Sequence, residues 1–329
     1  MRLRRRPSTA SDLKTYVQYL TVDCRYGSLF ERLPNVWCSL LKRESLLSAV
    51  VEDLDRAHGD RLLGIGVSVF LTDEFFRHAK YPPLFWIGPE LIRRIAQNDS
   101  TILDVRAIRR ANSGEGLNLF IWEADIRPTN EAELFTVSTE LIEAFFEFHS
   151  GFNIKEVINQ YPFGRMFRGA VQHGGWLIQA PSGEYVPVKD PDAVEDTGAP
   201  FILGLTRELA HNRPGSWLST IFDYRVPRLF LTPAEQRLLN TALNNATDDE
   251  IAEALTVSIS TVKKCWQSVY AKASLRLPEL LPDDCCELSG RGRGAEKKRR
   301  VLSYLRSHPE ELRPVLPLSA KANTGRIFM

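Results

Sequence analysis

The stretch Leu231–Ser274, LTPAEQRLLNTALNNATDDEIAEALTVSISTVKKCWQSVYAKAS, constrains the fold of this chain more than any other part. Thr232 suits a helix cap, Pro233 suits the first helical position, and Glu235 follows the cap by three residues. This is a capping box, in which the hydroxyl and the carboxylate each accept a hydrogen bond from a free backbone N–H. A helical apolar face follows, formed by Leu238, Leu239, Ala242 and Leu243. The segment therefore predicts a helix that begins at Pro233.

Two more helices are predicted in the same stretch. The acidic residues 248–250 place negative charge at a second helix start, where the helix dipole favours it. After the turn 256–258, Ser258 is placed to cap a third helix. The inward positions of the third helix are Val262, Trp266 and Val269. Its opposite face is short, polar and basic, and carries Ser260, Lys264, Gln267 and Ala271, with Thr261, Lys263 and Ser268 on the flanks.

This order of motifs resembles the LuxR/GerE-type helix-turn-helix of bacterial transcription regulators. The matching residues are Leu231, Thr232, Pro233 and Glu235 at the start, Glu250, Ile251, Ala252, Glu253 and Leu255 in the scaffold helix, and Ser258, Thr261, Val262 and Lys263 in the recognition helix. The resemblance implies that Thr261 and Lys263 touch phosphates or base edges, and that Lys264 and Gln267 help to read the sequence. The residues expected to contact DNA are Ser260, Thr261, Lys263, Lys264, Gln267 and Lys272. A homodimer is expected, because a single short helix reads too few bases for specificity.

A small interaction domain is the alternative interpretation of these helices. The basic residues nearby are almost balanced by acidic ones, and a DNA-binding protein usually gains affinity by neutralising phosphates. The acids cluster at the start of the scaffold helix, however, whereas Lys263 and Lys264 lie on the recognition helix. We therefore predict that the helix from Ser258 to Lys272 enters the major groove of double-stranded DNA.

Both ends of the chain are rich in basic residues. A helix is predicted at about 295–307, packing back on the domain or on a second copy, from the apolar residues Val301, Leu302, Tyr304 and Leu305. Two basic clusters either contact phosphates or lie in solvated tails; they are Arg291, Arg293, Lys297, Lys298, Arg299 and Arg300 near the C-terminus, and Arg2, Arg4, Arg5 and Arg6 at the N-terminus. A solvated tail is favoured after Pro314.

The composition excludes several classes of protein. The chain has 329 residues, of which 43% are hydrophobic and 25% charged, as in an ordinary globular protein with room for two domains. No apolar run approaches the ~20 residues that a membrane span needs. The five cysteines show no spacing typical of a zinc site, and they are Cys24, Cys38, Cys265, Cys285 and Cys286. The sequence predicts a cytoplasmic protein with free thiols, without a metal or a cofactor.

Residues 1–225 are interpreted as an α/β domain with a mixed sheet and flanking helices. Helices are predicted at Glu44–Ala57, Leu91–Gln97, Glu131–Ser150, Phe201–His211 and Trp217–Tyr224. Strands are predicted at Leu62–Leu71, at Ile102–Ile108 and Gly116–Ile126 as a hairpin, and at Phe167–Gln172, Trp176–Gln179 and Tyr185–Val188 as a meander.

One short pattern in this domain suggests an enzyme. The residues 61–66, RLLGIG, match the R-x-x-G-x-G pattern with which GNAT-like acyltransferases hold the pyrophosphate of acyl-CoA. In that fold the backbone N–H groups open a helix. Here Val67 and the residues after it indicate a strand, so a strand with two glycines is favoured. The order of elements is compatible with a GNAT-like or a PAS/GAF-like α/β fold.

Other polar and aromatic residues are open to two interpretations. Glu123 and Asp125 share one face of a strand, either as an acid/base pair or as solvent-facing carboxylates. His173 lies in a glycine turn, and a turn histidine is favoured over a site residue. Five tryptophans either line an apolar ligand pocket or fill the core, and they are Trp37, Trp86, Trp122, Trp176 and Trp217.

The main prediction is a bacterial transcription regulator with three parts. Residues 1–225 would sense a small molecule or mediate association, 229–276 would bind DNA, and 277–329 would form a basic tail with one helix. Two alternatives remain, in which the helix-turn-helix is only a docking module: a GNAT-like acyltransferase and a protein-interaction adaptor.

Overall fold

The computed structural model describes residues 1–18, 20, 25–127, 130–162, 165–194, 199–213, 217–244, 246–281 and 293–316. The chain divides into two compact units, Met1–Asp223 and Tyr224–Met329. The elements of the N-terminal unit are β1 (Leu3–Pro7), α1 (Ala10–Val17), η1 (Gly27–Arg32), α2 (Leu33–Lys42), β2 (Leu47–Asp53), η2 (His58–Asp60), β3 (Leu62–Leu71), α3 (Asp73–Lys80), α4 (Ile87–Ala96), α5 (Val105–Asn112), β4 (Leu117–Ile126), α6 (Glu131–His149), β5 (Ile154–Tyr161), α7 (Arg165–His173), β6 (Leu177–Gln179), β7 (Tyr185–Val186), η3 (Pro191–Ala193), β8 (Phe201–Thr206), α8 (Arg207–His211) and η4 (Trp217–Phe222).

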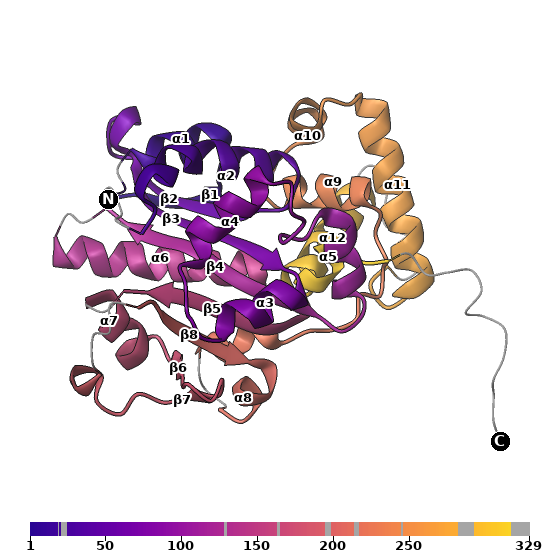
Figure 1. Cartoon of the computed structure of the whole chain (residues 1–329). Coiled ribbons are helices and arrows are strands. Elements are labelled where there is room, and N and C mark those ends of the chain that lie inside the picture. The colour runs from indigo at the N-terminus through magenta and orange to yellow at the C-terminus, as the bar shows by residue number, and fades with distance from the viewer. Residues whose placement is uncertain are drawn as a thin grey trace, which may run out of the picture. The chain divides into compact units, whose positions relative to one another are not determined.

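The N-terminal unit is an α/β domain built on an eight-stranded mixed sheet, as the sequence predicted (Figure 1). The strand order is β1-β2-β3-β4-β5-β8-β6-β7. Among the described strands, β4 and β5 are the parallel pair, and the other neighbours are antiparallel. Parallel neighbours need a crossover connection, which α6 supplies.

The two faces of the sheet are covered by different helices. Along β3, Ile65 and Val67 join the large core that includes residues of α1, α2 and α4. Gly64 and Gly66 alternate with them and lie against Val137 and Leu141 of α6. Since successive strand residues point to opposite faces, α6 covers the face opposite to α1, α2 and α4.

The longest predicted helix of this unit is confirmed. The Asn130 side chain accepts a hydrogen bond from Glu133 N at 3.0 Å and so caps α6, which has 19 residues. The strand predicted at Leu62–Leu71 is also confirmed as β3, and that at Gly116–Ile126 as β4.

The helix predicted at Glu44–Ala57 is wrong, because this segment contains the strand β2. Its apolar residues recur at helical spacing, but Ser48–Asp53 is buried on both sides of the chain. A strand covered on both faces shows a continuous apolar run rather than alternation. The helical spacing of these apolar residues therefore arises by chance, because every residue of Ser48–Asp53 is buried in the strand.

Three other predicted elements are also corrected. The strand at Ile102–Ile108 is wrong, since Asp104 accepts a hydrogen bond from Ala107 N at 2.7 Å and caps α5; β4 therefore pairs with β3 instead. The strand at Phe167–Gln172 is helix α7. The helix at Phe201–His211 begins as strand β8 and becomes helical only after its Thr206 cap.

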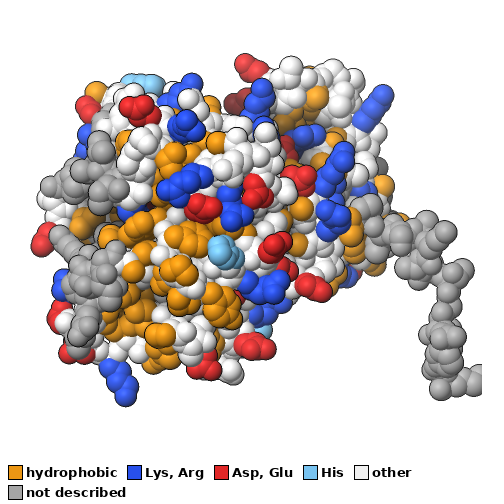
Figure 2. Space-filling model, viewed as in Figure 1, with side chains coloured by type: hydrophobic (Ala, Val, Ile, Leu, Met, Phe, Trp, Pro, Cys, Tyr) orange, Lys and Arg blue, Asp and Glu red, His pale blue; other side chains and the backbone are white. Residues whose placement is uncertain are grey.

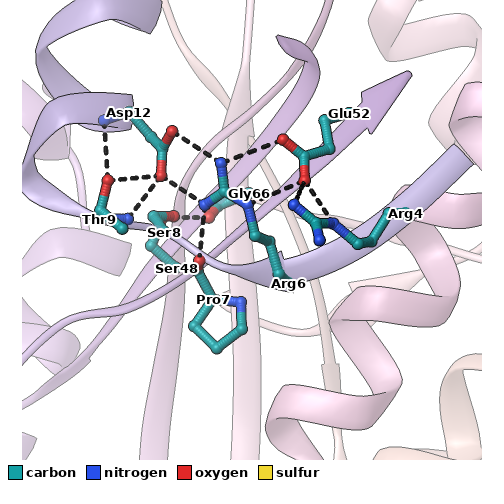
Figure 3. Close-up of polar contacts among 9 residues, drawn as sticks. All are labelled: Arg4, Arg6, Pro7, Ser8, Thr9, Asp12, Ser48, Glu52 and Gly66. Carbon is teal, nitrogen blue, oxygen red and sulfur yellow. Dashed lines mark hydrogen bonds and ion pairs between the residues drawn. The ribbon is translucent and has the colours of Figure 1, made fainter. Parts of the chain in front are cut away.

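The N-terminal arginines form an edge strand rather than a solvated tail (Figure 3). Arg6 donates to Asp12 Oδ2 at 2.6 Å and to Glu52 Oε1 at 3.1 Å, and Arg4 also binds Glu52. Burial alone would raise the pKa of Glu52, but the two arginines outweigh it and lower that pKa. Arg5 points to the other face and donates to Glu140 of α6 at 2.8 Å. These cations therefore join β1 to β2, α1 and α6.

The C-terminal unit contains the three helices predicted for Leu231–Ser274. They are α9 (Pro233–Leu243), α10 (Asp248–Leu255) and α11 (Ile259–Arg276), followed by α12 (Arg293–Ser307) and η6 (Pro309–Leu312). The capping box of Thr232 and Glu235 is confirmed, and Thr247 and Glu250 form another at the start of α10. Thr256 ends α10 in the left-handed conformation, at φ 54°, and Ser258 caps α11.

Helix α12 confirms the helix predicted at about 295–307, and it packs into the core of this unit. Val301 and Leu305 are buried with Val262, Trp266 and Val269 of α11. Lys298 pairs with Asp248 at 3.0 Å, and Glu296 accepts hydrogen bonds from Arg299 and Arg300. After α12, Glu311 accepts hydrogen bonds from the backbone N–H groups of Arg228 and Leu229, both at 2.9 Å. The last turn is thereby attached to the first residues of the unit.

The part of the chain that the structure describes has no helix that is long and apolar enough to cross a membrane. It also has no cluster of three side chains suited to hold a metal ion. Cys38 and Cys265 are free thiols, whereas Cys24, Cys285 and Cys286 lie outside the described residues.

Candidate functional site

Strand β4 carries a bulge at the centre of the sheet. Val67 of β3 pairs with Glu123, and the next residue Ser68 pairs with Ile121, so Trp122 is an extra residue. A bulge bends its strand and redirects side chains. On the other side, the pairing of β4 with β5 ends at Ile121, although β4 itself continues to Ile126. The two parallel strands therefore separate beyond the bulge.

A cavity of about 710 Å³ opens at this separation. It lies between α6 and α7 on one side and β2, β3, β4 and β5 on the other, and its lining is largely apolar. Its lining residues include Gly66, Ser68, Ala124, Leu141, Phe145 and Ala170. Its size and lining are typical of a small-molecule site.

Small residues on β3 allow both the close packing of α6 and the cavity. A Cβ atom at Gly64 would lie 3.3 Å from Val137 Cγ1, and one at Gly66 would lie 3.6 Å from Leu141 Cδ1. The RLLGIG pattern is thus part of a strand, as favoured from the sequence, and does not open a helix. Gly64 serves helix–sheet packing, whereas a Cβ at Gly66 would make an ordinary van der Waals contact with Leu141 and take up space in the cavity that Gly66 lines.

Glu123 lies at the bulge and lines the cavity. Its carboxylate pairs with Arg25 at 3.5 Å, and the guanidinium of Arg25 lies over Trp86, 5.2 Å from the ring centroid. Tyr161, at the end of β5, also lines the cavity and accepts a hydrogen bond from Asn159 at 3.0 Å. Burial, with the nearby charge of Glu123, raises the pKa of Tyr161, so its phenol stays protonated at neutral pH.

Asp125 has a different environment from Glu123, although both lie on β4. Its carboxylate accepts a hydrogen bond from Tyr16 of α1 at 3.1 Å. Burial, and then the charge of Asp125, raise the pKa of the Tyr16 phenol. The two carboxylates predicted as a possible acid/base pair therefore have separate partners, and Glu123 is the one at the cavity.

A serine–histidine pair lies at another part of the cavity wall. The Ser68 hydroxyl lies 2.6 Å from His149 Nε2, and His149 Nδ1 lies 2.6 Å from the carbonyl oxygen of Phe145. A carbonyl only accepts, so Nδ1 donates to Phe145, while Nε2 shares a hydrogen bond with the Ser68 hydroxyl, which also lies 3.5 Å from the carbonyl oxygen of Leu47. Both side chains are buried. This pair was not predicted from the sequence, because its partners are far apart along the chain.

The tryptophans that were expected either to line a pocket or to fill the core lie in different places. Trp176 lines the cavity. Trp37 and Trp122 fill the core of the other face, with their rings 6.1 Å apart at 90°. The side chains of His173 and Trp217 lie outside the described residues.

In the C-terminal unit, the residues predicted to contact DNA lie mostly on one exposed part of α11. Ser260, Thr261, Lys263, Lys264 and Gln267 are all exposed. Ser260 and Thr261 also exchange hydrogen bonds with the cap residue Ser258. Figure 2 shows Lys and Arg side chains on the visible face of this unit, around α9 and α11.

Lys272 differs from the other five. Its ammonium group donates to Glu235 Oε2 at 2.6 Å and to the carbonyl oxygen of Phe230 at 3.2 Å. Burial alone would raise the pKa of Glu235, but Lys272, Ser268 and the Thr232 N–H outweigh it and lower that pKa. Lys272 thus has partners inside the unit, and the DNA contact predicted for it stays a prediction.

No family model and no curated protein matches the sequence. Among solved structures, the chain is similar to the spermidine/spermine N-acetyltransferase SpeG from Vibrio cholerae, at 12% identity and a TM-score of 0.33, over 65% of this chain and 99% of that one. It is also similar to the aminoglycoside acetyltransferase AAC(6')-Ib in complex with coenzyme A, at 14% identity and a TM-score of 0.32, over 64% and 98%. A third is the ribosomal-protein-S5-alanine acetyltransferase from Vibrio fischeri, at 10% identity and a TM-score of 0.31, over 63% and 93%.

Proposed function

We propose that the N-terminal unit binds an acyl thioester of the acyl-CoA class and transfers the acyl group to an amine. The main observation in support of this proposal is that β4 stops pairing with β5 after Ile121, next to the cavity that Glu123 lines. A strand edge offers backbone groups to an extended ligand, and the arm of coenzyme A carries amides that pair with such an edge. This is the acyltransferase alternative of the sequence analysis.

The residues around the cavity fit the arm and the acyl group of acyl-CoA better than its pyrophosphate. The apolar lining suits the arm and the acyl group. The N-terminus of α6 would favour a phosphate through its free N–H groups. However, the first turn of α6 carries Glu131 and Glu133; Glu133 is paired with Arg56 at 3.0 Å, whereas Glu131 is exposed. A pyrophosphate at this helix end would therefore be opposed by the charge of Glu131.

In the proposed acyl transfer, Glu123 and Tyr161 have separate roles. Glu123 accepts a proton from the attacking amine as the nitrogen bonds to the thioester carbonyl carbon. The carbon–sulfur bond then breaks, and Tyr161 donates a hydrogen bond to the leaving sulfur. The sulfur ends as a thiol after taking up the proton released by the amine, and the acyl group ends as an amide.

The substitution Glu123→Gln tests this assignment. We expect the rate of thiol release from acyl-CoA in the presence of amines to fall about 10²- to 10⁴-fold, as for loss of a general base. The Kd for acyl-CoA, measured by calorimetry, should stay within a few-fold. Asp125→Asn is the matched control, because it lies on the same strand and its amide keeps a hydrogen bond to Tyr16. Equal rates for wild type and Glu123→Gln, or no acyl-CoA binding by the wild type, would contradict the proposal.

We propose DNA binding by the C-terminal unit as a second function. It is supported by the exposed polar and basic start of α11, which no acidic residue of α11 itself offsets, because this helix has none. The acidic start of α10 is engaged elsewhere: Glu250 belongs to a capping box and Asp248 pairs with Lys298. In this proposal Lys263 and Thr261 position the backbone, and Ser260, Lys264 and Gln267 read base edges.

Selection of genomic DNA with the full chain, followed by anisotropy titrations at several salt concentrations, tests this function. Lys264→Glu should weaken binding to the selected site, and loss of one phosphate contact by Lys263→Glu should reduce the salt slope by about 1. Arg306→Glu on α12 makes the same change of charge and should leave the site preference intact. No enrichment of any site, or no effect of Lys264→Glu, would exclude this role.

A further inference from the structure

The cavity extends well beyond the place where β4 and β5 separate. Both Glu131 at the start of α6 and His149 at its end line the cavity. Since α6 has 19 residues and a helix rises ~1.5 Å per residue, these lining residues are spread over about 27 Å. The cavity thus runs along the whole helix.

The strand register shows where each end of the cavity lies along β3 and β4. Leu141 lies over Gly66, which pairs with Ala124 beyond the bulge, where β4 has already left β5. His149 binds Ser68, which pairs with Ile121, where β4 and β5 are still joined. Glu131 is exposed, whereas Ser68 and His149 are buried, so the open end is near Glu131 and the closed end is at the Ser68–His149 pair.

We call the part of the cavity from Leu141 to His149 the inner arm. These residues are eight apart on α6, so the inner arm is about 12 Å long at ~1.5 Å per residue. An extended chain advances about 1.2 Å per bond, so an arm of this length holds about ten bonds. An acetyl group would fill only its entrance.

The lining of the inner arm suits an alkyl chain. Its apolar residues are Leu47, Ile121, Leu141, Ala144, Phe145 and Phe148. At the closed end, the Ser68 hydroxyl is used by His149 Nε2, and His149 Nδ1 is used by the Phe145 carbonyl. Because these polar groups satisfy each other, a terminal methyl group next to them leaves no buried donor unpaired.

We propose that the inner arm binds the acyl chain of the substrate and selects chains of about eight to ten carbons over acetyl, from the length of the arm at ~1.2 Å per bond. This inference rests on the proposed acyl-CoA binding and adds the class of acyl group. The thioester lies near Glu123 and the chain extends toward Ser68.

Calorimetry on the full chain with acetyl-CoA, octanoyl-CoA, hexadecanoyl-CoA and free octanoate tests the inner arm. Burial of methylene groups increases affinity up to about fourfold for each group, so octanoyl-CoA should bind at least about a hundredfold more tightly than acetyl-CoA. Hexadecanoyl-CoA should gain nothing over octanoyl-CoA, because its chain exceeds the arm. Ala144→Leu should reduce the preference for octanoyl-CoA at least tenfold, whereas Ala132→Leu, on the exposed side of the same helix, should not.

The outcomes separate this inference from the proposed function. Equal Kd values for acetyl-CoA and octanoyl-CoA would overturn the inner arm and leave acyl-CoA binding in place. Binding of octanoate without binding of any thioester would overturn the proposed function and retain an alkyl site. The chain-length series uses the wild-type protein, so it stays decisive even where Ala144→Leu lowers stability.

Discussion

Glu235 is the residue whose replacement should disturb the C-terminal unit most selectively. Its carboxylate accepts hydrogen bonds from Thr232 N at 2.6 Å, Ser268 Oγ at 2.7 Å and Lys272 Nζ at 2.6 Å. It therefore joins the start of α9 to the second half of α11. Glu235→Ala removes all three interactions at once.

The expected loss of stability can be worked out from these contacts. Loss of the capping interaction costs about 1 kcal/mol, and loss of a hydrogen bond to a charged group costs about 1.5–3 kcal/mol when the partner stays buried. The Lys272 side chain is 25% exposed and can be rehydrated, which reduces the second figure. We therefore expect Glu235→Ala to lower the free energy of unfolding by about 2–3 kcal/mol.

Hydrogen exchange in peptides from α9 and α11, read by mass spectrometry, measures this change in the C-terminal unit alone. Glu250→Ala is the matched control, because Glu250 occupies the same place in the capping box of α10 but is exposed and, among the described residues, hydrogen-bonds to Thr247 alone. Its effect should be clearly smaller. Equal effects of the two substitutions would refute the argument that the contacts to Ser268 and Lys272 matter.

The same carboxylate also sets a dependence on pH. Its pKa in the folded protein is lowered below the usual value near 4.5, so the deprotonated form is favoured by folding. The stability that Glu235 contributes is therefore complete above the unfolded pKa and is lost as the pH falls through the folded pKa. The difference between wild type and Glu235→Ala should shrink in acid, and a difference that grows in acid would contradict the ion pair.

Two further predictions concern the N-terminal unit. Gly88→Ala would place a Cβ atom 2.7 Å from the Tyr26 hydroxyl and 2.8 Å from Trp122 Nε1. Overpacking should therefore lower the free energy of unfolding by about 1–3 kcal/mol, as measured by thermal unfolding. An unchanged Tm would contradict this expectation. Glu131→Gln should tighten acyl-CoA binding by about two- to fivefold at low salt, since a charge at a helix end contributes about 0.3–1 kcal/mol. Glu140→Gln, farther along the same helix, should not tighten binding, and an equal gain there would indicate a general effect of net charge.

The sequence was informative where local chemistry decides the structure. The Thr232–Glu235 capping box, the acidic residues 248–250 and the Ser258 cap identify the three helices of Leu231–Ser274, and Leu62–Leu71 is identified as a buried strand. At 47–53 the same reasoning was wrong, because burial on both faces removes the alternation that marks a strand. Local spacing also gave no sign that Asp104 would begin a helix.

The cavity could not be predicted because it depends on pairings between distant segments. Ser68 and His149 are 81 positions apart, and only the crossover of α6 brings them together. The extra residue Trp122, beyond which β4 no longer pairs with β5, is visible only in the register with β3. One signal was present in the sequence: Gly64, Gly66 and Ser68 alternate as small residues on one side of β3. A small residue at every second position indicates a face with room for a helix or a ligand.

The hydrogen bonds of Glu311 bear on where a fragment made to test the proposed DNA binding should end. The helix-turn-helix predicted from the sequence would alone suggest a fragment that stops at Arg276. Such a fragment would lack the carboxylate that pairs with the N–H groups of Arg228 and Leu229, and the carbonyl oxygens that accept from the Gln236 side chain. It would also uncover Val262 and the rest of the core that α12 closes. The smallest autonomous folding module is therefore expected to continue through Arg313, so that truncation at the motif would yield an unstable peptide whose failure to bind DNA is uninformative.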